Sequence, residues 1–109
     1  MADMMINVDE ALGRFNGNDT IYKMLLKKFV SSPYFEELKS FLSENNLEQA
    51  ERSAHTIKGT AGNLSLTALY DISCILDEQL KNGHDYVDSF AQLQTVYDQT
   101  MGEIKSYVS

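Results

Sequence analysis

Apolar residues recur every three or four positions along most of the chain, the spacing that places them on one face of an α-helix. Short polar stretches interrupt this pattern at about residues 16–19, 31–33, 44–46, 65–67 and 81–85. One proline and six glycines are too few for the turns that many short β-strands would need. The pattern therefore predicts helices over about 8–15, 20–30, 33–43, 47–64, 67–81 and 86–104.

The residues at the ends of these segments favour the same boundaries. Asn7 followed by Glu10 resembles a capping box, Ser32 can cap a helix that begins at Pro33, and Gly83 is suited to end a helix. Because the connections are short, consecutive helices are expected to lie antiparallel. We predict an all-α fold: an antiparallel four-helix bundle with one or two short extra helices at the N-terminus.

In the predicted helix over 47–64, a histidine lies away from the apolar face. At 100° per residue, His55 lies roughly 135° from the centre of that face, and Gly59 roughly 175°. Lys58 lies at the boundary, roughly 75° away, where its ammonium can reach the imidazole. His55 is therefore expected to face solvent. The apolar face is formed by Leu47, Ala50, Ala54, Ile57, Ala61 and Leu64.

Two glycines, Gly59 and Gly62, follow His55 on the side predicted to be exposed. Each costs roughly 1 kcal/mol relative to alanine inside a helix, and no core contact is expected to offset that cost. A tight contact with a neighbouring helix, or simple tolerance, is the plainer explanation for one such glycine. Two glycines beside an exposed His-x-x-Lys favour a helix surface that another molecule can approach closely.

Three kinds of chemistry could in principle use an exposed imidazole beside a lysine. Metal binding fits poorly, because His84, the other histidine, is far along the chain and Lys58 is a cation where a ligand would be needed. Hydrolysis by a catalytic triad needs a cleft, which a smooth bundle face does not offer. Phosphoryl capture fits better, since a neutral imidazole is nucleophilic near pH 7 and Lys58 can neutralise phosphoryl oxygens.

Charge and composition narrow the range of partners. The net charge of −7 argues against nucleic acid and anionic membranes, and favours a partner with a basic patch. The single cysteine, Cys74, cannot form an internal disulfide, which indicates a cytoplasmic protein. We see no signal peptide, and no run approaches the roughly 20 apolar residues of a membrane helix. The initial methionine and the complete bundle favour a free-standing single domain over 1–109.

The stretch AHTIKGTAGNL, at 54–64, resembles the histidine-containing phosphotransfer (HPt) domain family, with its His-x-x-Lys-Gly core. NVDEALGRFNGNDTIYKMLLKKFV, from residue 7, resembles the N-terminal region of the family. TALYDISCILDEQLKNG, from residue 67, resembles the helix after the phosphorylation site. The resemblance covers roughly residues 6–84. The last helix matches only in length and pattern.

This resemblance implies a role for each residue of the motif. His55 would accept the phosphoryl group, Lys58 would stabilise it, and Gly59 would provide access; Gly62 is added from the helix geometry alone. The partner would be the receiver domain of a response regulator or hybrid sensor kinase, which supplies the aspartate and the Mg²⁺. The chain itself would hold no cofactor, metal or ATP site, and would act as a monomer. Ser65 departs from the family, which often has glycine there.

The predicted hairpin around Ser65 places His55 level with about Leu76. Asp77 could then lie near the site and hold Lys58 or tune His55, although an ordinary solvated carboxylate is the simpler interpretation. Three N-terminal residues, Phe15, Ile21 and Tyr22, belong to a region that forms an apolar docking surface in the family; each is individually better explained as core.

Two functions remain open. The first is a phosphorelay intermediate that accepts a phosphoryl group on His55 from a receiver aspartate and passes it to another. The alternative is a helical adaptor that binds signalling partners without being phosphorylated. The intact His-x-x-Lys-Gly favours the first, because an adaptor has no use for that combination. An enzyme or metal-binding bundle would need inward-facing Glu and His pairs, whereas the predicted faces are apolar.

Overall fold

The computed structural model describes residues 5–109, and all regular secondary structure in that range is helical. The helices are α1 (Val8–Arg14), α2 (Asp19–Val30), α3 (Tyr34–Ser43), α4 (Leu47–Asn63), α5 (Thr67–Asn82) and α6 (Val87–Val108). The prediction of an all-α fold is confirmed. The first four residues of the predicted 1–109 domain lie outside the described range, and so does the start of the N-terminal stretch in which no signal peptide is expected.

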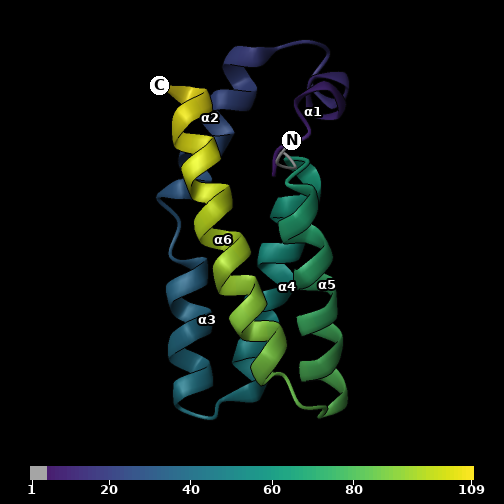
Figure 1. The fold of residues 1–109 in the computed structure, drawn as a ribbon, viewed down its shortest axis with the longest axis vertical. Coiled ribbons are helices and arrows are strands. Elements are labelled where there is room, and N and C mark those ends of the chain that lie inside the picture. Colours follow the sequence, from purple (N-terminus) through teal and green to yellow (C-terminus); the bar gives the residue numbers. More distant parts are fainter. Residues whose placement is uncertain (1–4) are drawn as a thin grey trace.

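The helices form an elongated bundle of 41 × 28 × 21 Å. In Figure 1, α3, α4, α5 and α6 lie side by side along the long axis. The long helix α6 continues past α3 to lie beside α2, and α1 lies near the turn that joins α4 to α5. Helix α4 packs between α3 and α5. Among residues 5–109, no helix is both long and apolar enough to cross a lipid bilayer.

The face of α4 predicted to be apolar is the one that packs into the core. Its inward residues are mostly alanines, which are fully buried and allow α3 and α5 to approach closely. Leucines from α5 and α6 complete the core, and full burial of each is worth about 1.5–3 kcal/mol. Phe35 of α3 stacks on Tyr97 of α6, with ring centroids 4.3 Å apart. Packing of these faces fixes the direction in which the other side of α4 points.

One predicted helix start is wrong. Pro33 occupies the cap position of α3 rather than its first helical position, and the helix begins at Tyr34. Ser32 does not cap α3, because its hydroxyl donates instead to the carbonyl of Phe29, 2.7 Å away in the last turn of α2. The same serine therefore helps to end one helix rather than to begin the next. Gly83, by contrast, ends α5 in the left-handed conformation as predicted, with φ +69°.

The turn between α4 and α5 is tied to the N-terminal helices. Ser65 has φ +57°, a conformation that favours glycine, and its backbone carbonyl accepts a hydrogen bond from the Asn7 amide at 2.9 Å. Its hydroxyl donates to Glu10 at 2.8 Å. The Asn7 side chain caps α1 as predicted, but Glu10 bonds Ser65 and so does not complete a capping box. Buried Tyr22 donates its phenol to the Leu64 carbonyl at 2.6 Å, so α2 holds the same turn.

Candidate functional site

His55 lies in the middle of α4, on the side away from the alanine face. Its side chain is 60% exposed, as the helix geometry predicted. Packing of Ala54 and Ile57, both fully buried, fixes this orientation. The imidazole is therefore held on a rigid helix with one edge open to solvent.

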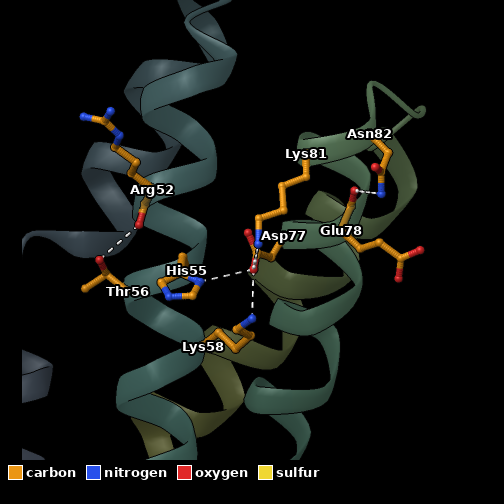
Figure 2. Close-up of polar contacts among 8 residues, drawn as sticks. All are labelled: Arg52, His55, Thr56, Lys58, Asp77, Glu78, Lys81 and Asn82. Atoms are coloured by element: carbon orange, nitrogen blue, oxygen red, sulfur yellow. Dashed lines mark hydrogen bonds and ion pairs between the residues drawn. The ribbon is translucent and has the colours of Figure 1, made fainter.

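Asp77 of α5 lies directly beside this imidazole. Its Oδ2 is 3.3 Å from Nδ1 of His55 and 2.9 Å from Nζ of Lys58 (Figure 2). The Asp77 side chain is only 3% exposed. The simpler interpretation of the sequence, an ordinary solvated carboxylate, is therefore wrong. The structure thus brings together three residues, His55, Lys58 and Asp77, that the sequence placed on two separate helices.

Two lysines neutralise the buried carboxylate. Lys58 forms the closer contact, and Lys81, one turn after Asp77 on α5, places its ammonium 3.8 Å from the same oxygen. The hydrogen bond with Asp77 raises the pKa of Lys58. Burial alone raises the pKa of Asp77, but its interactions with Glu51, Lys58 and His55 outweigh burial and lower that pKa to about 2. Asp77 is therefore ionised at neutral pH.

The ionised carboxylate determines which nitrogen of His55 carries the proton. A carboxylate can only accept hydrogen bonds, so Nδ1 of His55 must donate to Asp77. The proton of a neutral imidazole then lies on Nδ1, and Nε2 keeps its lone pair. Asp77 thereby selects the tautomer in which Nε2 carries the free lone pair.

Sequence reasoning missed Glu51, which precedes His55 by one turn of α4. Its interaction with Asp77 raises the pKa of Glu51 and contributes to the lowered pKa of Asp77. Asp77 Oδ1 is buried and accepts no hydrogen bond from residues 5–109. The i, i+4 spacing of Glu51 and His55 was a signal for this proximity. Glu51, His55 and Asp77 each offer a metal-type donor atom, and the three atoms lie within 4.8 Å of one another.

The two glycines of α4 differ in their surroundings. Gly59 is exposed, and a Cβ placed on it would meet nothing within 4 Å. A Cβ on Gly62 would lie 3.2 Å from the ring of Tyr70 on α5. The expectation that Gly62 lies on the open surface is therefore corrected, because Gly62 allows a close contact between helices. Only Gly59 leaves open space one turn from His55.

A cavity of about 680 Å³ flanks the end of α4 beyond Gly59. Its apolar wall comes from Phe15, Leu25 and Phe29, and Thr60 contributes the edge from α4. Of the three residues compared with the docking region of the family, Phe15 lines this cavity, Ile21 is 41% exposed and Tyr22 is core. Apolar surface thus adjoins the helix that carries His55.

Comparison with models of protein families identifies a domain family that covers most of this chain. The family model described as Hpt domain matches residues 30–103, which is more than half of the chain. Searches of curated proteins and of solved structures found no match. The matched range includes α4 with His55 and α5 with Asp77. The chain therefore belongs to the Hpt domain family.

Proposed function

We propose that this chain is a phosphorelay intermediate that carries a phosphoryl group on Nε2 of His55. The observation that carries the proposal is the contact between Nδ1 of exposed His55 and the buried, ionised carboxylate of Asp77. This contact leaves Nε2 as the nucleophilic nitrogen. Membership of the Hpt domain family supports histidine phosphotransfer as the general function.

The proposed step is an in-line transfer from the acyl phosphate of a receiver aspartate. The lone pair of Nε2 attacks phosphorus, the P–N bond forms, and the P–O bond to the receiver carboxylate breaks, with the electron pair leaving on that carboxylate. The ring keeps its proton on Nδ1 and becomes positively charged, and Asp77 stabilises this charge. Attack by the aspartate of a second receiver reverses these bond changes and returns His55 to the neutral form.

Lys58 is proposed to stabilise the transferred group. Its ammonium lies on the same side of α4 as His55 and is 24% exposed, so it is accessible to phosphoryl oxygens. In the resting protein it bonds Asp77 at 2.9 Å, which holds it beside the imidazole. This prior placement lowers the entropy cost of orienting the charge during transfer.

The proposed partner surface is the open side of α4. Gly59 presents no side chain next to His55, so a receiver domain can bring its aspartate close to Nε2. We place the apolar part of the contact at the cavity lined by Phe15, Leu25 and Phe29. Mg²⁺ and the reacting aspartate would come from the receiver, and this chain would act without an ATP site of its own.

The alternative, an adaptor without phosphotransfer, does not explain the buried charge on Asp77. A buried carboxylate that bonds both an exposed histidine and a lysine is costly to maintain for shape alone.

The test is transfer from a receiver domain that carries a radiolabelled phosphoryl group. We expect label on the wild type and on His84→Gln, a matched loss of the other histidine, and none on His55→Gln. Equal labelling of His55→Gln and the wild type would overturn the assignment. Absence of label on every form would favour the adaptor.

A further inference from the structure

The cluster of Glu51, His55 and Asp77 has the donor set of a metal site, although the sequence alone argues against metal binding. One imidazole nitrogen and two carboxylates converge from two helices, with donor atoms within 4.8 Å of one another. Glu51 and His55 are four residues apart on α4, the spacing that lets two side chains of one helix bind the same ion. Asp77 reaches them from α5.

A second observation points independently to a ligand. The Asp77 side chain is only 3% exposed, yet its Oδ1 accepts no hydrogen bond from the residues that the structure describes. His55, Lys58 and Lys81 all contact the other oxygen, Oδ2. A buried carboxylate oxygen without a donor is unfavourable, and a cation bound to it would satisfy it.

We propose that Glu51, His55 and Asp77 bind a divalent transition-metal ion of the Zn²⁺ class. Three N/O ligands with the fourth position left to water is the arrangement of open zinc sites. An imidazole ligand favours Zn²⁺ over Mg²⁺, which prefers oxygen ligands in an octahedron. The exposed edge of His55 leaves the ion a route from solvent.

The two lysines set the strength of this site. They place positive charge near Asp77, which weakens the binding of a cation. Lys81 is 56% exposed and can turn into solvent when the ion binds, whereas Lys58 is only 24% exposed. The site is therefore expected to bind Zn²⁺ reversibly rather than to hold it as a structural ion.

A bound ion would occupy the imidazole that the proposed function uses. Zn²⁺ would then slow phosphorylation of His55, and a chelator would restore it; this consequence rests on the proposed function. The site itself does not, because its binding can be measured without any phosphoryl donor. Failure of metal binding and failure of phosphotransfer are thus separate results.

The test is titration of the full chain with ZnCl₂ at pH 7. Calorimetry and the ¹⁵N shifts of the histidine rings monitor the binding. We expect one ion per chain and a shift at His55. Binding should weaken by about tenfold or more in Glu51→Gln and in His55→Gln, since a lost ligand costs at least as much as a lost outer-shell partner. Glu48→Gln, an exposed carboxylate on the same helix, and His84→Gln should bind as the wild type does.

A third variant separates this site from the phosphoryl site. Lys58→Met should bind Zn²⁺ a few-fold more tightly, because it removes a nearby positive charge, while the same variant should accept a phosphoryl group more slowly. The proposal is overturned if no ion binds, if Glu51→Gln binds as tightly as the wild type, or if the shift occurs at His84 instead of His55. Displacement of Zn²⁺ by an equal concentration of Mg²⁺ would also contradict a histidine-containing site.

Discussion

Oδ2 of buried Asp77 lies 3.3 Å from Nδ1 of exposed His55, across the interface between α4 and α5. This contact joins the fold to the proposed chemistry. Packing of α4 against α5 buries the carboxylate, and hydrogen bonds keep it ionised. The ionised carboxylate in turn fixes the tautomer of His55.

Asp77→Asn should slow phosphorylation of His55 by about tenfold or more, since a hydrogen bond to a charged group is worth about 1.5–3 kcal/mol. The rate with a small donor such as phosphoramidate measures this effect. The ¹⁵N shifts of the His55 ring should show loss of the single tautomer, a readout that a merely structural role would not move. An unchanged tautomer and rate would contradict the positioning role.

Stability should depend on pH through Asp77. Its pKa is lowered from 3.8 to about 2, so its ionised form stabilises the fold above about pH 4, and this contribution is lost as the pH falls towards 2. The difference in free energy of unfolding between wild type and Asp77→Asn should therefore shrink by roughly 2 kcal/mol between pH 5 and pH 2. Urea unfolding of the two proteins across this pH range measures the difference. A difference that does not change with pH would contradict the lowered pKa.

The two glycines of α4 should respond differently to alanine. Gly59→Ala should raise the free energy of unfolding by up to about 1 kcal/mol, because the added methyl meets open space and the helix gains propensity. Gly62→Ala should gain less or lose stability, because its methyl meets the Tyr70 ring at 3.2 Å. The double variant Gly62→Ala/Tyr70→Ala should be more stable than Tyr70→Ala alone, because no ring then opposes the added methyl. Equal effects at both glycines would show that Tyr70 does not constrain Gly62.

Ser65 combines an unfavourable backbone conformation with a favourable hydrogen bond. Ser65→Ala keeps φ near +57° but loses the bond to Glu10, so it should destabilise the fold by about 1 kcal/mol. Ser65→Gly loses the same bond but removes the steric cost of about 1–2 kcal/mol, so it should be close to neutral or stabilising. Thermal unfolding of the two variants compares them directly. A glycine variant as unstable as the alanine variant would contradict this explanation.

Regular spacing made most of the fold predictable from the sequence. The apolar face of α4 alone gave the direction of His55, because helix rotation per residue is constant. The exact start of α3 was not predictable, since Ser32 can bond either of two neighbouring helices and the sequence does not decide between them. Helix geometry also could not show that Tyr70 covers Gly62, because it gives the direction of a side chain but not the reach of a neighbouring one.

The burial of Asp77 shows the same limit at the site. Asp77 lies roughly 95° from the centre of the apolar face of α5, at its boundary, where a carboxylate is ordinarily solvated. Its burial depends on α4 packing against that boundary and on Lys58 reaching across the interface. The spacing of Glu51 and His55 on α4 indicates that the two are neighbours, but only the packing of α5 brings Asp77 to them. Pairs within one helix are visible in a sequence, whereas a cluster formed by two helices needs their packing.

The most direct test of the central claim is the intact mass of the protein after incubation with phosphoramidate, for wild type, His55→Gln and His84→Gln. We expect one acid-labile phosphoryl group on the wild type and on His84→Gln, and none on His55→Gln. An adduct that persists in His55→Gln, with all three proteins folded, would contradict the assignment of His55 as the phosphoryl acceptor.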